Sequence, residues 1–305
     1  MQIEKKVLMN CDIETGICET PQAFSENKNA IAKKAVKLLY FTDPICSSCW
    51  GIEPQLRKLK QEYGEYFDIE YRMGGLLKSW SDYGGNDVSG PQSVAQHWEE
   101  ASAYYNMPID GDLWNEDPLH SSFPPAIAFK AAQLQGNHKA DQFLRRIKEM
   151  VFIEKKNITK LELLVKAANE AGLDQIQFEY DYLHKAKQLF EEDLVMAREW
   201  NVRGFPTIYF IDEDDNRFKV YGSKPYQVYE QALLKLLPDN AVKAAASSFD
   251  NIFKGYDTVT LKEFAVFFDK SLEEGETILN EFEEQKKVKR IVSKAGNLWY
   301  KHKIR

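Results

Sequence analysis

The stretch Tyr40-Phe41-Thr42-Asp43-Pro44-Ile45-Cys46-Ser47-Ser48-Cys49-Trp50 decides how this 305-residue chain folds. An apolar, β-prone run over 36–42 leads into it, and an amphipathic helical pattern over 53–63 follows it. A strand, a C-x-x-C and a helix in this order predict a redox-active pair of thiols, Cys46 and Cys49.

The spacing of the two cysteines has a chemical reason. Residues three apart share a face of a helix, so Cys46 and Cys49 can close a disulfide within one turn. Cys46 is expected at the helix N-terminus, where free N–H groups and the positive end of the helix dipole favour a thiolate, which is the nucleophilic form. Cys49 is expected to lie deeper and to resolve a mixed disulfide from inside.

Three other interpretations of the C-x-x-C stay open. It could be half of a zinc site, but a structural zinc site needs four ligands and the chain has only five His. The remaining cysteines, Cys11 and Cys18, lie in a polar segment and could pair with each other or be ordinary surface thiols. Cys46 and Cys49 could also be inert core residues, although these suit the middle of a helix better. Finally, a redox fold can lose its turnover and serve as a binding platform.

Composition narrows the function classes. The net charge of −7 argues against a general nucleic-acid binder, and the apolar content of 44% is ordinary for a globular protein. No apolar run is long enough to span a membrane. Residues 1–29 are polar and lack the apolar centre of a signal peptide. We therefore expect a cytoplasmic protein that binds neither membrane nor nucleic acid, and there an accessible C-x-x-C is more often catalytic or sensing than structural.

Hydrophobic patterns predict the remaining elements. Strands are expected over 36–42 and 67–73, from Pro206 to about 212, and over 217–221. Pro54 lies inside a helix expected over 51–63 and predicts a kink there. A block with almost no strand signal is expected to form helices over 94–105, 124–135, 140–152, 161–171, 178–185 and 189–200. Thr159 and Glu162 have the spacing of a capping box before the fourth of these. A further helix is expected over 225–237.

Residues 241–305 are expected to form a separate unit. Two helices, over 260–268 and 271–287, precede a hairpin over 288–293 and 298–303, which is the outline of a small winged-helix-like module. Lys and Arg gather near its end, at positions 286, 287, 289, 290, 294, 301, 303 and 305. A series of Glu residues in its second helix would repel phosphates. Contact with a partner protein or simple packing is therefore favoured over DNA binding.

The order of these segments resembles the DsbA-like branch of the thioredoxin superfamily over about 36–237. That order is strand, C-x-x-C helix, strand, long helical block, Gly204-Phe205-Pro206-Thr207, hairpin and helix. The resemblance implies an α/β, thioredoxin-like fold with a large helical insertion. It also implies that Pro206 is cis and faces the cysteines, with Phe205 and Thr207 beside it in contact with substrate.

The chain is thus expected to have four parts. They are an N-terminal segment (1–35), a thioredoxin-like core (36–90 and 201–237), a helical insertion (91–200) and a C-terminal helix-helix-hairpin module (238–305).

Two finer resemblances bear on function. The octapeptide Asp43 to Trp50, together with Met73-Gly74-Gly75-Leu76, resembles a cytoplasmic subgroup described as predicted dithiol-disulfide isomerases, or FrnE-like. The chain length and the tail also resemble bacterial adaptor proteins that present the regulator Spx to the ClpXP protease. The dipeptide between the cysteines is Ser47-Ser48, not the Pro-His of strongly oxidising periplasmic enzymes. With no imidazolium near the first sulfur, we expect weaker oxidising power.

Two functions of different class follow. The first is a thiol-disulfide oxidoreductase or isomerase that acts on protein or small-thiol substrates. In it Cys46 attacks, Cys49 resolves and Pro206 positions the client, while the other site residues contact substrate: Ser47, Ser48, Trp50, Phe205 and Thr207. The alternative is an adaptor that binds a partner protein and delivers it to ClpXP. The C-terminal module is the candidate surface for this partner. A glutathione-dependent isomerase of small molecules is disfavoured, because such enzymes commonly have Ser at the position of Cys46. None of these readings implies a cofactor or a metal.

Overall fold

The computed structural model describes residues 10–11, 18–19, 34–82, 90–244 and 248–302, and the chain divides into two units, 1–33 and 34–305. In the first unit, strands β1 (Asn10–Cys11) and β2 (Cys18–Glu19) pair antiparallel, with Cys11 opposite Cys18. The side chains of these two residues, and therefore the alternatives for their thiols, lie outside what the structure describes.

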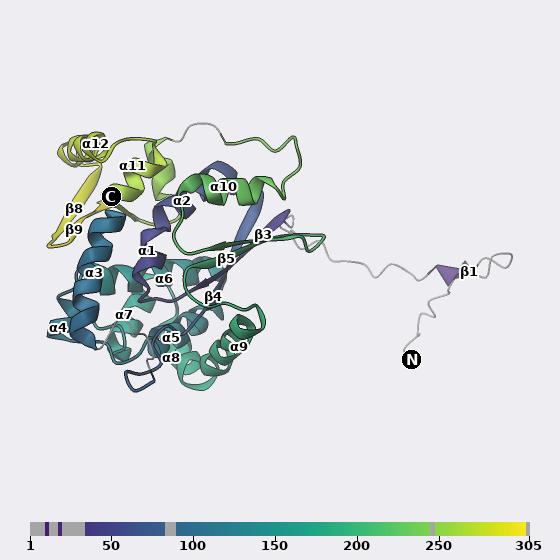
Figure 1. Cartoon of the computed structure of the whole chain (residues 1–305), viewed down its shortest axis with the longest axis horizontal. Helices are drawn as coiled ribbons and strands as arrows, with labels where there is room; N and C mark the ends of the chain where they lie inside the picture. The colour runs from purple at the N-terminus through teal and green to yellow at the C-terminus, as the bar shows by residue number, and fades with distance from the viewer. Residues whose placement is uncertain (1–9, 12–17, 20–33, 83–89, 245–247, 303–305) are drawn as a thin grey trace, which may run out of the picture. The chain divides into compact units, whose positions relative to one another are not determined.

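A four-stranded sheet forms the centre of the second unit (Figure 1). Its order is β4-β3-β5-β6, where β3 (Val36–Thr42) pairs parallel with β4 (Phe67–Met73) and antiparallel with β5 (Thr207–Asp212), and β6 (Arg217–Tyr221) lies at the edge. Six of the seven residues of β3 are buried. A strand covered on both faces carries a nearly continuous apolar run, which is why this stretch of sequence is recognisable.

Alternate residues of β3 pack into different cores. Leu39 and Phe41 contact the cluster that includes Ala197 of α9 (Ala186–Glu199). Leu38 belongs to the main core, together with Leu59 of α2 (Glu53–Tyr63). The sheet is therefore covered by helices on both faces, as expected for a thioredoxin-like core.

The chain after Thr42 turns into two short helices rather than one. Helix α1 (Ser47–Gly51) ends before Ile52, and α2 begins at Glu53. Pro54 lies in the first turn of α2, where its missing N–H would have no partner in any case. The prediction of a kink inside a single helix is therefore wrong, because Pro54 helps to start the second helix.

Seven helices connect β4 to β5 in the described part of the chain, and α10 (Tyr226–Leu234) follows β6. Within this long connection the bounds are α3 (Pro91–Tyr105), α4 (Leu113–Glu116), α5 (Phe123–Gln133), α6 (Asn137–Phe152), α7 (Leu161–Glu170), α8 (Gln175–His184) and α9. The block agrees with the expected helical insertion, apart from α4, which is too short to show a period. None of the described helices has both the length and the apolar character needed to cross a bilayer.

The predicted capping box before α7 does not form. The N-cap of α7 is Lys160, with no side-chain hydrogen bond to the helix. The Thr159 hydroxyl instead donates to Asn157 Oδ1 at 2.6 Å. A local side-chain turn has taken the hydroxyl that the capping box requires.

The C-terminal module packs against the rest of the second unit, although the sequence suggested a separate unit. It contains η1 (Phe249–Phe253), β7 (Thr258–Thr260), α11 (Leu261–Phe267), α12 (Leu272–Glu284), β8 (Val288–Ser293) and β9 (Gly296–Lys301), with strand order β7-β9-β8. Val259, Phe264 and Trp299 lie in a small core of its own. Figure 1 shows the module beside α1, α2 and α3, and residues 34–305 form one compact unit.

Several basic residues of the module are engaged in ion pairs. Arg290 pairs with Glu283, and Lys301 pairs with Asp250. Lys294, between β8 and β9, reaches Asp112 of the segment before α4. Three of the eight basic residues noted in the sequence are therefore engaged in ion pairs within the molecule.

Candidate active site

Cys46 and Cys49 meet at the beginning of α1. Cys46 is the N-cap of this helix, and its sulfur accepts a hydrogen bond from the Cys49 amide at 3.2 Å. Both thiols are free. Cys46 is 5% exposed and Cys49 is fully buried, so the first sulfur is the more accessible one. The structure thus brings the two predicted residues together with the deeper position occupied by Cys49.

The protonation of the pair differs from the expectation for Cys46. Burial raises the pKa of the Cys46 thiol well above its ordinary value, and hydrogen bonding to Cys49 raises it further. Burial also opposes ionisation of Cys49, but the hydrogen bond from Cys46 and the charge of Lys148 lower the pKa of that thiol. In this reduced arrangement a single amide at the tip of a five-residue helix does not offset the loss of solvent.

The segment before β5 lies next to the cysteines. The Phe205–Pro206 peptide is cis. The register of β3 and β5 ends at Phe41 opposite Thr207, which puts Pro206 at the level of Thr42. The Thr42 side chain is in turn one of the groups near Cys49 that lower the pKa of that thiol. Pro206 is therefore close to the redox pair across the sheet.

The neighbours of Pro206 differ in their access to a substrate. Thr207 is fully buried, and its hydroxyl donates to the Gly204 carbonyl at 2.7 Å, so it stabilises the turn rather than facing solvent. Phe205 is half-buried and its ring covers Gly74, where a Cβ would come within 1.9 Å of it. Of these two residues, Phe205 is the more exposed one.

The residues between and after the cysteines have three different environments. Ser47 is nearly buried, while Ser48 is half-buried and accepts a hydrogen bond from the Tyr105 hydroxyl at 3.0 Å. The Trp50 ring, which is expected to contact substrate, is fully buried. The indole stacks on Phe152, with ring centroids 5.6 Å apart, and donates to the Pro108 carbonyl.

Tyr105 is a site residue that the sequence reasoning missed. It comes from the end of α3, and its ring lies against Gly51, where an added Cβ would come within 2.4 Å of the ring carbon Cγ. Its hydroxyl reaches Ser48 of the C-x-x-C. The helical insertion therefore covers the cysteine pair with an aromatic side chain, a contact for which the local sequence gives no signal.

A buried ion pair lies near the two cysteines, and the sequence analysis did not predict it. Lys148 of α6 and Glu53 of α2 are 2.6 Å apart, and both are almost completely buried. The Lys148 charge acts on Cys49 and on Asp43. A lysine within the apolar face of a predicted helix is the sequence signal that could have marked it.

A second charged network connects the redox helix to the C-terminal module. The Arg145 guanidinium lies 4.6 Å from the centroid of the Trp50 ring and makes two hydrogen bonds with Glu263 of α11, at 2.7 and 3.0 Å. Arg57 of α2 also pairs with Glu263, at 3.2 Å. These guanidinium groups lower the pKa of the Glu263 carboxyl to about 2 against the effect of burial. The module is therefore attached through buried charges beside the residue that follows Cys49.

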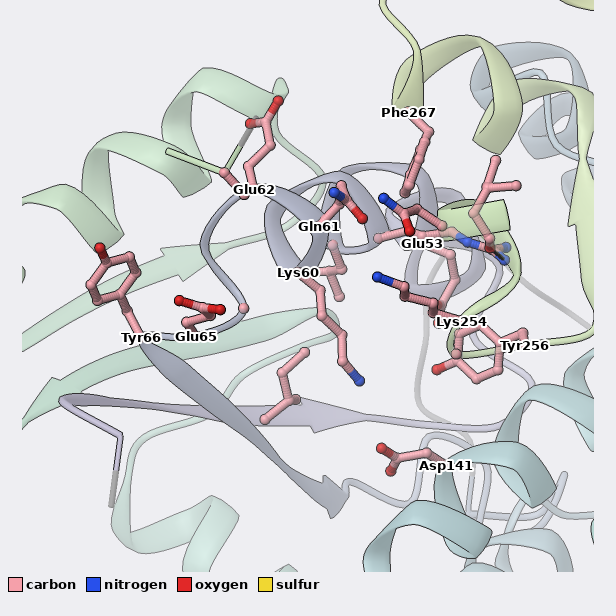
Figure 2. A pocket seen from close by; sticks show the side chains of 18 of the residues that line it. Glu53, Lys60, Gln61, Glu62, Glu65, Tyr66, Asp141, Lys254, Tyr256 and Phe267 are labelled. Atoms are coloured by element: carbon pink, nitrogen blue, oxygen red, sulfur yellow. Dashed lines mark hydrogen bonds between the residues drawn. The ribbon is translucent and has the colours of Figure 1, made fainter. Parts of the chain in front are cut away.

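A cavity of about 820 Å³ lies away from the two sulfurs (Figure 2). Its walls come from α2, β4, α6 and the segments around 242–244 and 251–256. Figure 2 shows Lys60, Asp141 and Tyr256 pointing into it from three of these elements. Burial raises the pKa of Asp141 to about 6, and Lys60 partly opposes this rise. The cavity is thus shared by the core, the insertion and the module.

One group of carboxylates has the geometry to hold a cation. Ligand oxygens of Glu99, Asp110 and Asp112 lie within 4.8 Å of one another. The Lys294 ammonium already pairs with Glu99 and Asp112, at 3.3 and 2.8 Å. In this structure the group therefore functions as an anchor for the β8–β9 hairpin.

Comparison with known proteins gives two findings. A family model described as Thioredoxin matches residues 39–231. A relative from Halalkalibacterium halodurans, the ClpXP adapter protein SpxH, is 36% identical over 296 residues, which cover 95% of this chain and 96% of the relative.

Solved structures share the fold at low identity. A putative protein disulfide isomerase from Nitrosomonas europaea has a TM-score of 0.58 and 21% identity, over 67% of this chain and 97% of the other. The cytosolic disulfide reductase DsbM from Pseudomonas aeruginosa has a TM-score of 0.53 and 21% identity, over 66% and 100%. The thioredoxin-like fold with a helical insertion, predicted from the sequence, is confirmed.

Proposed function

Because this chain belongs to the Thioredoxin family and to the family of ClpXP adapter proteins named SpxH, we propose that it binds a partner protein and delivers it to the ClpXP protease. The observation that carries this proposal is the extent of the likeness. A match over 95% of the chain extends well beyond residue 231, where the Thioredoxin model ends, and so includes the C-terminal module. The partner we propose is the regulator Spx, which the resemblance in the sequence implies.

The attachment of the module supports an adapter. An adapter has to hold its client and the protease in a fixed relation, and mobile parts would weaken that relation. Here Arg145 and Arg57 bind Glu263 of the module in a buried network, and Lys294 anchors the hairpin to Glu99. The core and the module therefore present their surfaces with a defined geometry. The proposal also locates the protein in the cytoplasm, as the sequence analysis expects.

Degradation of the client by purified ClpXP tests the adapter function. Spx is incubated with ClpXP and ATP, with and without this protein, and its half-life is measured on gels. We expect the protein to shorten the half-life severalfold, and the double variant Cys46→Ala, Cys49→Ala to do the same in reducing buffer. A half-life that does not change on addition of the folded protein would contradict the proposal.

The cysteine pair supports a second candidate function, thiol-disulfide exchange. Two free thiols share one helical turn, and the cis peptide before Pro206 lies beside them. Access selects Cys46 as the attacking sulfur, since Cys49 is fully buried even though its pKa is the lowered one.

The exchange is a balanced two-electron reaction. The Cys46 thiolate attacks one sulfur of a client disulfide, the client S–S bond breaks, and the other client sulfur leaves as a thiolate. The Cys49 thiolate then attacks Cys46, and the second client sulfur leaves. The client is reduced, and Cys46 and Cys49 are oxidised to a disulfide. Pro206 and the backbone of Phe205 are proposed to position the client chain.

Trapping of the mixed disulfide tests this second function. In Cys49→Ser the resolving thiol is missing, so clients stay attached to Cys46 and appear as a ladder on non-reducing gels of cell extract. Cys46→Ser, with the same loss of one thiol, should give no ladder. If neither variant traps a protein and the wild type does not reduce insulin, the exchange function is refuted while the adapter function is unaffected.

A further inference from the structure

Asp43 is a fully buried carboxylate at the base of the cysteine loop. It lies between the end of β3 and Cys46, and its solvent exposure is 0%. The Ile45 amide donates to Oδ1 at 3.1 Å, and the Leu76 amide donates to Oδ2 at 2.7 Å. Its own carbonyl accepts from the Cys46 amide at 3.2 Å. One residue therefore connects the cysteine loop to the segment that follows β4.

A hydroxyl of the helical insertion completes the site. Ser122, the N-cap of α5, donates to Asp43 Oδ2 at 2.8 Å. The Leu77 amide donates to the same hydroxyl oxygen, at 3.0 Å, so the hydroxyl hydrogen is available for Asp43. In every hydrogen bond that the described residues make to this carboxylate, the carboxylate accepts and its partner donates. A protonated carboxyl would need an acceptor for its own hydrogen, so this arrangement suits the ionised form.

We infer that Asp43 is a positioning residue of the redox pair: it fixes the loop before Cys46 to the segment after β4 and to the start of α5, and it holds a negative charge beside the sulfurs. A negative charge disfavours a thiolate, and destabilising the thiolate favours the disulfide over the dithiol. Asp43 therefore makes the pair more reducing. The inference deepens the proposed thiol-disulfide exchange and rests on it for its biological use, but the effect on the sulfurs is a property of the folded chain.

The charged groups that face Asp43 agree with this role. From its own loop Cys46 faces it, and the Asp43 charge is one of the causes that raise the pKa of that thiol. From α6 the Lys148 ammonium faces it, in its pair with Glu53. Burial raises the pKa of Asp43 to about 6, although the donors at Leu76, Ile45 and Ser122 and the Lys148 charge oppose the rise. At neutral pH the carboxylate is therefore largely ionised.

Replacement by asparagine separates charge from shape. Asp43→Asn keeps the size of the side chain and one acceptor oxygen but removes the charge. We expect the first thiolate of the pair to form about one pH unit lower than in the wild type, because a like charge near a buried thiol is removed. At a pH above that at which both proteins form this thiolate, the equilibrium with glutathione should move about tenfold toward the dithiol, which is about 30 mV for a two-electron couple; at pH 7.5 the shift approaches this size in proportion to the thiolate present.

The experiment measures both properties on the full-length protein. Thiolate formation is followed by its ultraviolet absorbance against pH, and the disulfide fraction is measured in glutathione buffers at pH 7.5 and pH 5. Below about pH 6 the wild-type Asp43 is itself neutral, so the difference from Asp43→Asn should shrink to less than about twofold at pH 5. A loss of positioning alone would shift the equilibrium equally at both pH values.

Two further variants control for folding. Ser122→Ala keeps the Asp43 charge but removes one of its donors, which should raise the pKa of Asp43. In proteins that carry Ser122→Ala, the effect of Asp43→Asn on the sulfurs should therefore disappear at a higher pH than it does in proteins that keep Ser122. Asp181→Asn removes another buried carboxylate, on α8, which interacts with its own helix through Gln177, and it should leave the sulfur titration unchanged. Circular dichroism establishes that each variant is folded.

The outcomes distinguish the inference from the function on which it rests. If the wild type forms no disulfide in any glutathione buffer, the exchange function fails and the thiolate titration still tests Asp43. If the disulfide forms but Asp43→Asn titrates and equilibrates like the wild type, the role of Asp43 is refuted. A shift of the same size at pH 7.5 and pH 5 also overturns the electrostatic part of the inference.

Discussion

Cys46 experiences two opposing effects within one turn of helix. The Cys49 amide donates to its sulfur, which favours the thiolate, while burial of the thiol favours the protonated form. The second effect wins, and the pKa of Cys46 is raised. In the proposed exchange, attack by this sulfur would therefore require a change in its surroundings.

This balance predicts slow chemical modification of the reduced protein. At pH 7.5 we expect iodoacetamide to alkylate Cys46 at least about tenfold more slowly than it alkylates free glutathione, because a buried thiol of raised pKa has little thiolate and little access. The measurement is the rate of mass increase under pseudo-first-order conditions. Alkylation of Cys46 at the glutathione rate or faster would contradict the burial seen here.

The contact of Gly51 with Tyr105 gives a second expectation. Gly51→Ala forces a Cβ against the Tyr105 ring, so it should destabilise the protein by about 1–3 kcal/mol and expose Cys46 to alkylation. In the double variant with Tyr105→Ala the added methyl has space, so the two effects should not add. Gly255→Ala, where no atom lies within 4 Å of the new Cβ, is the control. Additive urea unfolding energies for Gly51→Ala and Tyr105→Ala would show that the contact is not tight.

Some residues of the site could be predicted from the sequence, and others could not. Cys46 and Cys49 follow from their spacing, and Pro206 follows from the resemblance to the DsbA-like family. Asp43 stands within the quoted motif, yet its role depends on Leu76 and Ser122, which are brought to it by the sheet and the insertion. Partners so distant in sequence leave no local pattern.

At the scale of elements, the length of a helix or strand and the burial of its residues decided whether the sequence predicted it. Strands β3, β4 and β6 were predicted with their observed bounds, since each is an apolar or alternating run with the two-residue period of a strand. Strand β7 has three residues and η1 has five, which is too short for a period to be visible. The start of α1 after Cys46 agrees with the helix N-terminus expected there from the C-x-x-C, although the hydrophobic pattern alone begins only at residue 51.

Helices α11 and α12 offer a matched pair of capping residues. Glu263 and Glu274 each occupy the third position of a helix and accept the N-cap amide in a capping box. Glu263 is buried against Arg145 and Arg57, whereas Glu274 is exposed. We expect Glu263→Gln to lose about 3–5 kcal/mol of stability, because two guanidinium groups keep their burial without this partner.

Glu274→Gln should cost less than about 1 kcal/mol, since it removes only an exposed capping contact. Urea unfolding at pH 7 measures both variants. Equal losses would mean that the buried network contributes no more than the caps.

At the scale of the whole molecule, this network gives the second unit a specific response to acid. The pKa of Glu263 is depressed from 4.5 to about 2 in the folded protein, so its contribution is fully present above pH 4.5 and is lost as the pH falls through about 2. We expect the wild type to lose about 3 kcal/mol more than Glu263→Gln between pH 5 and pH 2. The comparison cancels the other carboxyl groups, and urea midpoints at both pH values measure it. Equal acid sensitivity would exclude Glu263 as the cause.

The position of Trp50 makes its fluorescence a natural probe of the cysteine pair and of the C-terminal module. Its indole follows Cys49 in the chain and lies under Arg145, which binds the module through Glu263. We expect both sulfur chemistry on one side and release of the module on the other to alter the quenching of this ring. Tyrosine or phenylalanine in place of the other tryptophans would leave a single emission band. The emission maximum and the fluorescence lifetime of Trp50 would then report both events without an attached dye.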